Sequence, residues 1–123
     1  MSDLTILVVD DEPALLAGTA RMLQKAGYDV LRAKDGVEAN DVAATSGIDL
    51  LLTDGVMPHG SGPELAADLR RRFPTLAVVV MTGDATSAEL SGRGDLVVLA
   101  KPFTQEQLLD AVRDAFGGVV TGR

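Results

Sequence analysis

Short apolar runs alternate with longer amphipathic stretches along the whole 123-residue chain. The apolar runs, rich in Leu, Ile and Val, predict strands at residues 4–9, 28–33, 48–53, 76–81 and 96–99. Apolar positions three or four residues apart predict helices at about residues 13–26, 37–46, 63–73 and 105–116, and a short or irregular helix after Thr86. Strict alternation of strand and helix implies right-handed crossovers and a parallel sheet covered on both faces. We therefore predict an α/β fold, a three-layer α/β/α sandwich with five strands and five helices.

Glycine and proline mark the predicted ends of the helices. Gly27 ends the first helix, Gly47 the second and Pro74 the third, and Gly117 with Gly118 ends the last. The mixture of charged and apolar residues at 28–33 predicts an edge position for the second strand. The residues of the first helix that we expect to face inward are Leu15, Leu16, Met22, Leu23 and Ala26.

The composition limits the classes of function. A chain of this length forms one domain, which we expect to span residues 1–118 with a tail at 119–123. The net charge of −7 disfavours binding to nucleic acid or to an anionic membrane. The absence of cysteine excludes disulfides, thiol catalysis and thiolate metal sites. Without a leader-like N-terminus or a membrane-length apolar run, the sequence predicts a cytoplasmic protein.

A single carboxylate, Asp54, follows the most apolar of the central runs, and the chain then turns at Gly55 and Pro58. In open parallel sheets, ligands bind in the crevice outside the carboxyl ends of the strands. Taken alone, a carboxylate in this position is a nucleophile, a metal ligand or a helix cap. The residues that follow the other strands decide among these roles.

Two more carboxylates, Asp10 and Asp11, follow the first strand. If the first and third strands are neighbours, these groups and Asp54 crowd one crevice and repel one another. A divalent cation resolves that repulsion, and an all-oxygen ligand set with room for water suits Mg²⁺. The backbone carbonyl of Val56 is a natural additional ligand. The sequence therefore predicts a magnesium site at this edge of the sheet.

Thr82 follows the fourth strand and Lys101 follows the fifth. The lysine can pair with Asp54 at rest, or with an anion attached to it, and the threonine supplies a hydroxyl donor. A carboxylate nucleophile, a metal, a lysine and a hydroxyl together describe an aspartyl-phosphate site.

Four segments carry a resemblance to a known family. They are VVDDEP (8–13), TDGVMPHGSGPEL (53–65), VVMTG (79–83) and AKPFTQEQLL (100–109). In this order, each at the end of a strand, they resemble the receiver domain of two-component response regulators, the CheY-like family. The wording of the second segment is most similar to receivers attached to hybrid histidine kinases.

The resemblance implies a role for each of these residues. Asp54 is implied as the phosphoacceptor, Asp10 and Asp11 as the metal pair, Thr82 as the switch hydroxyl and Lys101 as the phosphate-binding lysine. It also implies a cis bond at Lys101-Pro102 and the strand order 2-1-3-4-5. The implied donor is the phosphohistidine of a histidine kinase or histidine phosphotransfer domain. The output is changed binding to a downstream protein that the sequence does not identify.

Two departures from the family pattern concern the output. Val98 stands where receivers with a threonine–aromatic switch carry Tyr or Phe, three residues before the lysine. The separation of Thr82 and Lys101 is also shorter than usual, consistent with a truncated fourth helix. Both features favour an alternative, a receiver-fold interaction module that signals without phosphorylation, whereas the complete acidic site argues against it.

Other functions fit the residues less well. Asp10 and Asp11 could serve only to cap the first helix. A dehalogenase-like phosphatase needs a second acid two residues after the nucleophile, where this chain has Val56. A flavin-binding protein of this fold needs a phosphate loop after the first strand, and the acidic run there would repel the phosphate. The chain is too short to add a DNA-binding output to this domain.

Overall fold

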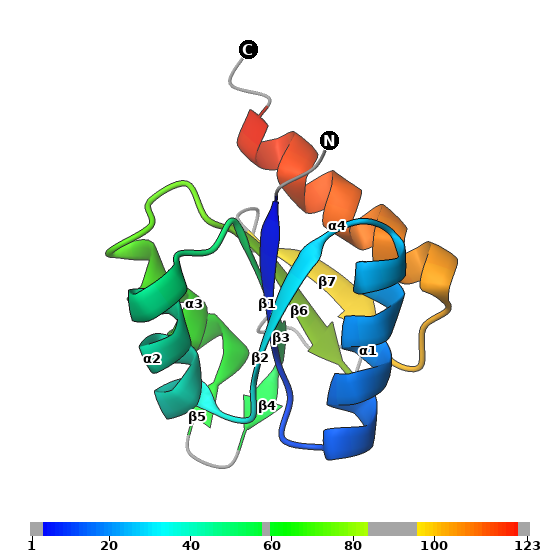
Figure 1. Ribbon diagram of the computed structural model, residues 1–123, viewed down its shortest axis with the longest axis horizontal. Coiled ribbons are helices and arrows are strands. Elements are labelled where there is room, and N and C mark those ends of the chain that lie inside the picture. The colour runs from blue at the N-terminus through cyan, green and yellow to red at the C-terminus, as the bar shows by residue number, and fades with distance from the viewer. Residues whose placement is uncertain (1–3, 58–59, 84–95, 121–123) are drawn as a thin grey trace.

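A five-stranded parallel sheet runs through the centre of the protein (Figure 1). The computed structural model describes residues 4–57, 60–83 and 96–120. The sheet has the order β2-β1-β3-β6-β7. Since β6 and β7 are the fourth and fifth strands of the sheet along the chain, the order 2-1-3-4-5 is confirmed. The strands are β1 (Thr5–Val9), β2 (Asp29–Ala33), β3 (Leu50–Asp54), β6 (Ala77–Thr82) and β7 (Val97–Ala100).

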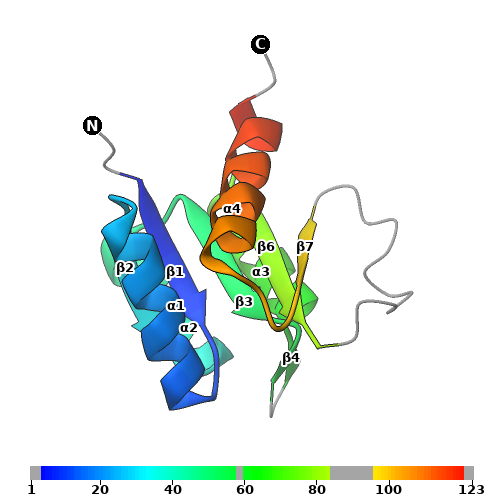
Figure 2. The same ribbon diagram turned by 90° about the vertical axis from the view of Figure 1, so that its right-hand side faces the viewer.

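Helices cover both faces of the sheet, as Figures 1 and 2 show. One face is covered by α2 (Gly36–Ser46) and α3 (Gly62–Arg70), the other by α1 (Pro13–Lys25) and α4 (Gln105–Val120). The three-layer sandwich is therefore confirmed. The further helix predicted after Thr86 lies outside the described residues. None of the helices in the described ranges is long and apolar enough to cross a bilayer.

The alternation of side chains along the strands divides the core into two layers. Leu51 packs with Leu65 and Leu69 beneath α2 and α3. Its neighbours Leu50 and Leu52 point the opposite way and pack with the residues beneath α1 and α4. Because β3 is apolar on both faces, it occupies the centre of the sheet, and its last residue, Asp54, is fixed there.

Several predicted helix ends are confirmed. Gly27, two residues after the end of α1, and Gly47, directly after α2, have positive φ values of 103° and 73°, at which residues with a Cβ are strained. The Ser61 side chain caps α3 by accepting a hydrogen bond from the Glu64 N–H at 3.2 Å. At the other end, α3 stops at Arg70 rather than Phe73. The Arg70 side chain donates hydrogen bonds to the carbonyl of Leu76, at 3.1 and 2.9 Å.

The predicted end of the last helix is wrong. The α4 helix continues through Gly117 and Gly118 to Val120, into the segment 119–123 predicted as a tail. Glycine costs about 1 kcal/mol in a helix interior but breaks it only where the backbone turns to positive φ. Gly117 has no such φ value.

Two inward positions predicted for α1 are also wrong, since Leu15 and Ala26 are exposed. The buried stripe of this helix consists of Thr19, Ala20 and Leu23, with Leu16 half-buried above it. Leu15 lies beside that stripe and is 40% exposed. A feature without a sequence prediction is the small antiparallel hairpin β4 (Val56–Met57) and β5 (Gly60–Ser61), which follows Asp54.

Candidate functional site

Asp54 is held at the carboxyl end of β3 by the backbone of its neighbour β6. It lies in register with Met81, and the N–H of Gly55 donates to the carbonyl of Met81 at 2.8 Å. A Cβ on Gly55 would lie 3.2 Å from that same carbonyl, so the absence of a side chain allows this close approach. The chain therefore leaves the sheet directly after Asp54, and the Asp54 carboxylate lies where the carboxyl ends of the strands meet.

Gly62 completes the support of Asp54 from the start of α3. A Cβ at this position would lie 2.5 Å from the Asp54 carbonyl oxygen and 2.9 Å from Thr53 Cγ2. The Gly62 N–H also donates to the carbonyl of Gly55 at 3.0 Å. Only glycine allows α3 to approach so closely, and the sequence analysis missed this role. The Ser-Gly-Pro triplet, in which a glycine precedes a proline at the helix start, is the signal that marks it.

Asp10 is a buried charge, only 2% exposed, at the end of β1. Its N–H donates to the carbonyl of Ala33 at 3.2 Å, and its Oδ1 accepts from the N–H of Glu12 at 3.0 Å. A buried carboxylate requires such partners, because removing an ionised group from water costs on the order of several kcal/mol. The N-cap of α1 is Glu12, with no side-chain cap hydrogen bond, so the N-cap position falls on neither Asp10 nor Asp11.

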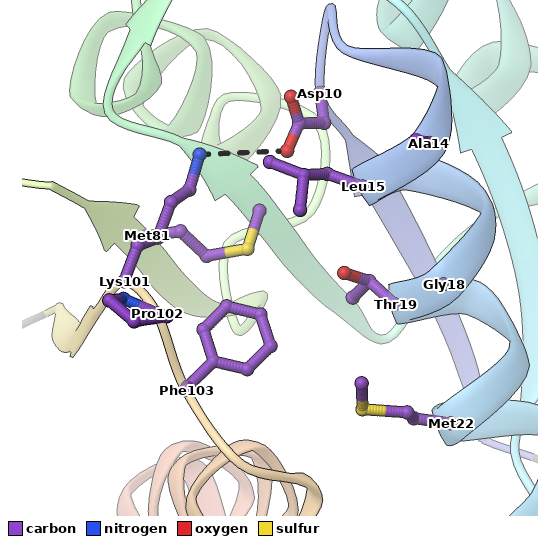
Figure 3. A pocket seen from close by; sticks show the side chains of 10 residues that line it. All are labelled: Asp10, Ala14, Leu15, Gly18, Thr19, Met22, Met81, Lys101, Pro102 and Phe103. Atoms are coloured by element: carbon purple, nitrogen blue, oxygen red, sulfur yellow. Dashed lines mark ion pairs between the residues drawn. The ribbon is translucent and has the colours of Figure 1, made fainter.

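Lys101 joins two of these carboxylates. Its Nζ lies 3.1 Å from Asp54 Oδ1 and 3.6 Å from Asp10 Oδ2 (Figure 3 shows the second pair). The Lys101-Pro102 bond is cis, as expected from the resemblance. The backbone N–H of Lys101 donates to the carbonyl of Thr82 at 2.8 Å. The lysine is therefore fixed to the end of β6 while its side chain reaches the acidic residues.

Thr82 is the last residue of β6 and is buried. It lies in register with Ala100 of β7, directly before Lys101. Gly55 lies beside it, since a Cβ on that glycine would be 3.9 Å from Thr82 Cβ. The structure thus brings Thr82, Lys101 and the chain around Asp54 together at one edge of the sheet, as the sequence predicts.

The three predicted carboxylates form one cluster. Asp10, Asp11 and Asp54 each offer an oxygen, and these oxygens lie within 4.8 Å of one another. With Lys101 included, the cluster has three negative charges and one positive charge, a net charge of −2. The Lys101 ammonium group offsets only part of the negative charge of these oxygens. Carboxylate oxygens this close together fit a hard divalent cation such as Mg²⁺. Val56 follows Asp54 by two residues in β4, with its side chain pointing to solvent.

Residue 98, where this chain has Val in place of the aromatic residue of the family pattern, lies within the described residues. Val98 lies in β7, which is an edge strand, and its side chain is exposed. A Val side chain is too short to swing between a buried and an exposed position as a large aromatic ring can. The rest of the region predicted to differ, residues 84–95, lies outside the described residues.

Comparison with known proteins gives one consistent family. Residues 6–113 match the family described as "Response regulator receiver domain". The chain is 36% identical over 115 residues to the sensor kinase CckA of Brucella abortus, and 40% identical over 111 residues to the response regulator MprA of Mycobacterium avium. These matches cover 89% and 88% of this chain but only 12% and 49% of the relatives, so the chain spans at most about half of their length.

Solved structures agree with the sequence comparison. The receiver domain of the hybrid histidine kinase CckA is 34% identical, with a TM-score of 0.77, over 90% of this chain and 97% of that one. The chemotaxis response regulator CheY4 of Vibrio cholerae is 29% identical, with a TM-score of 0.82, over 93% and 99% of the two chains. The likeness therefore covers the whole fold and not only the acidic edge.

Proposed function

The chain belongs to the response regulator receiver domain family, and on that basis we propose that it is the phosphoacceptor of a two-component phosphorelay. In this proposal Asp54 takes a phosphoryl group from the phosphohistidine of a histidine kinase or of a histidine phosphotransfer domain. Relatives named as a sensor kinase and as response regulators support that choice of partner. The proposed result is a change in affinity for a downstream protein.

The transfer requires little acid–base chemistry from the protein. A carboxylate oxygen of Asp54 attacks phosphorus, forming an O–P bond, while the P–N bond to the donor imidazole breaks and its electron pair returns to the ring nitrogen. A carboxylate is ionised at neutral pH, so no general base is needed to activate it. Water later attacks phosphorus, the O–P bond to Asp54 breaks with its electron pair returning to the carboxylate, and inorganic phosphate is released.

The residues around Asp54 support this chemistry electrostatically. Lys101 Nζ, 3.1 Å from Asp54 Oδ1, is close enough to follow the negative charge when it moves to the phosphoryl oxygens. The Thr82 hydroxyl is proposed as a further donor to those oxygens. The backbone N–H of Lys101 donates a hydrogen bond to the Thr82 carbonyl, so the two proposed donors lie beside each other at this edge of the sheet.

We propose that Asp10, Asp11 and Asp54 hold Mg²⁺, with the Val56 backbone carbonyl as an additional ligand. When bound, the ion would neutralise charge on the phosphoryl oxygens during transfer. The proximity of the three carboxylates supports this assignment: their oxygens lie within 4.8 Å of one another, and Lys101 pairs with two of them.

The observation that carries the proposal is the pairing of Lys101 with both Asp54 and Asp10 at the edge where three carboxylates meet. The test is the intact mass after incubation with acetyl phosphate and Mg²⁺, beside the Asp54→Asn variant. We expect one added phosphoryl group on the wild type and none on the variant, whose near-isosteric side chain leaves the fold intact. Stoichiometric labelling of Asp54→Asn would overturn the assignment.

The alternative function is an interaction module that signals without phosphorylation, and Val98 is the observation that favours it. Beryllofluoride, a stable phosphoryl mimic, distinguishes the two. A protein that binds it with Mg²⁺ but gives no adduct with acetyl phosphate has a working site, and either its dephosphorylation is fast or acetyl phosphate is a poor donor. Failure of both reagents would favour the module.

A further inference from the structure

Thr53, the residue before the acceptor Asp54, is a polar side chain with none of its surface exposed. It lies on the face of β3 that packs beneath α2 and α3, since Leu51, two residues earlier on the strand, belongs to that layer. Its register neighbours are Val9 of β1 and Val80 of β6, which are apolar and fully buried in the same layer. A valine has the same shape as Thr53, so the hydroxyl is what distinguishes this residue. A buried hydroxyl is destabilising unless it has a hydrogen-bond partner.

The partner of this hydroxyl is the backbone of the acceptor. Thr53 Oγ1 donates a hydrogen bond to the carbonyl oxygen of Asp54 at 3.0 Å. The sulfur of Met57 lies 4.0 Å from the same Oγ1 and is the weaker acceptor of the two, because a thioether accepts hydrogen bonds poorly. The Thr53 methyl group faces the start of α3, where a Cβ on Gly62 would lie 2.9 Å from Thr53 Cγ2. Close packing of the methyl group therefore directs the hydroxyl at the Asp54 carbonyl.

The hydrogen bond from Thr53 acts on the peptide group that joins Asp54 to Gly55. The carbonyl of this group accepts from Thr53, and its N–H donates to the carbonyl of Met81 at 2.8 Å. Because a peptide group is planar, the two bonds hold it from both sides. Gly55 gives little resistance to rotation of the plane, since it has no Cβ. The Asp54 carboxylate is attached next to this plane, so a rotation moves it relative to Lys101 Nζ, which is 3.1 Å from its Oδ1.

We propose that Thr53 is a positioning residue for phosphoryl transfer, whose hydroxyl fixes the backbone of the acceptor. Thr53 is buried beneath α3 and acts through Asp54, not on the phosphoryl group itself. This inference rests on the proposed phosphoacceptor function and adds a residue to it. The attack on phosphorus depends on the direction of the attacking oxygen, and small displacements of reacting groups lower the rate strongly. Thr53 therefore affects the rate of phosphorylation and not only the stability of the fold.

The test compares Thr53→Ser with Thr53→Ala, which differ only in the hydroxyl group. Both variants lose the methyl group, so its contribution to packing is removed from both. At a fixed concentration of acetyl phosphate and Mg²⁺, we expect Thr53→Ser to be phosphorylated within about twofold of the wild-type rate and Thr53→Ala about fivefold more slowly. A fivefold change corresponds to about 1 kcal/mol, the contribution of one neutral hydrogen bond. Intact mass over time measures the rate.

Thr53→Val keeps the shape of the side chain and supplies a second test. Its additional methyl group takes the place of the hydroxyl, 3.0 Å from the Asp54 carbonyl oxygen. This is closer than the separation of about 3.3 Å or more at which carbon and carbonyl oxygen meet. The carbonyl must therefore move away, and we expect phosphorylation to slow at least about fivefold, as in Thr53→Ala. A wild-type rate in Thr53→Val would overturn the inference.

Val78→Ala controls for the loss of stability. Val78 is buried in the same layer as Thr53, but it lies near the start of β6, in register with Leu51 and not with the acceptor. The variant loses core packing without losing a contact to Asp54. Urea unfolding followed by circular dichroism measures the stability of every variant, and we expect Val78→Ala to be phosphorylated at the wild-type rate. Slow phosphorylation of Val78→Ala would assign the effect to stability alone and overturn the inference.

The hydrogen bond also has a spectroscopic readout that does not depend on phosphorylation. The chemical shift of the Asp54 carbonyl carbon responds to a hydrogen bond that its oxygen accepts. We expect this shift to change in Thr53→Ala and to stay near the wild-type value in Thr53→Ser. The same shift in both variants would show that the hydroxyl does not hold the acceptor backbone.

The rates distinguish a failure of this inference from a failure of the proposed function. A wild-type protein that is not phosphorylated contradicts the proposed function, and the role of Thr53 fails with it. Equal phosphorylation rates of the wild type and Thr53→Ala leave the proposed function standing and overturn the inference alone. Equal slowing of Thr53→Ser and Thr53→Ala would assign the effect to the lost methyl group and overturn the role of the hydroxyl.

Discussion

The ammonium nitrogen of Lys101 lies 3.1 Å from Oδ1 of Asp54, although the two residues are 47 positions apart in the chain. The same nitrogen lies 3.6 Å from Asp10 Oδ2. Lys101 is 21% exposed and therefore only partly screened by water. It therefore compensates part of the negative charge of the acidic cluster.

Removing this ammonium group should separate its two effects. In Lys101→Met we expect phosphorylation of Asp54 by acetyl phosphate to slow by at least about tenfold, because a charge-assisted contact to the transferring group is lost. The affinity for Mg²⁺ should rise by up to about tenfold, because the carboxylates lose their competing cation. Calorimetric titration measures the affinity, and intact mass over time measures the rate.

The matched control for this prediction is Lys25→Met, which removes the same charge at the exposed end of α1. It should leave both quantities near the wild-type values. Weaker Mg²⁺ binding in Lys101→Met would show that the lysine helps to organise the metal site rather than competing with the ion.

Neutralising the acidic pair should abolish metal binding. We expect the double variant Asp10→Asn with Asp11→Asn to lose measurable Mg²⁺ affinity, because two of the three clustered carboxylates become neutral amides. Asp10→Asn can still accept the hydrogen bond from Glu12 N–H, so the start of α1 should persist. Calorimetry measures the binding, and circular dichroism checks the helix content.

Exposed acidic residues elsewhere supply the control for the pair. Asp41→Asn with Asp29→Asn changes the net charge by the same amount, at two exposed positions away from the cluster. This control should retain the wild-type affinity. If both double variants bind Mg²⁺ like the wild type, the ion lies outside the acidic cluster and the proposed metal site is wrong.

The site could be predicted from the sequence because each of its residues lies at the carboxyl end of a strand or directly after it. Asp10, Asp54, Thr82 and Lys101 follow β1, end β3, end β6 and follow β7, respectively. In a parallel sheet all these positions meet at the same edge, so the order of strands and helices is sufficient to place them together. The distances between the side chains required the structure.

Other features depend on how elements pack and leave little local signal. Leu15 is exposed although the apolar periodicity of α1 predicts an inward position. The continuation of α4 past Gly117 conflicts with the local preference of glycine for helix ends. The β4–β5 hairpin consists of two-residue strands, too short for an alternating pattern.

Two glycines with opposite surroundings provide the last prediction. Alanine at Gly62 would place a Cβ 2.5 Å from the Asp54 carbonyl oxygen, whereas alanine at Gly18 would meet nothing within 4 Å. We expect Gly62→Ala to lower the free energy of unfolding by about 1–3 kcal/mol, through displacement of α3 from the end of β3. Gly18→Ala should raise it by about 0.5–1 kcal/mol, because alanine favours the interior of α1.

Urea unfolding followed by circular dichroism measures both variants under the same conditions, and it suits a chain without tryptophan. Gly62→Ala should also slow labelling of Asp54, since the displaced backbone belongs to the acceptor residue itself. Asp54 should be labelled at the wild-type rate in Gly18→Ala, because residue 18 lies within α1 and a Cβ there meets nothing within 4 Å. A Gly62→Ala protein with wild-type stability would show that α3 can shift without cost, and the close approach at Gly62 would then have no role in holding the acceptor.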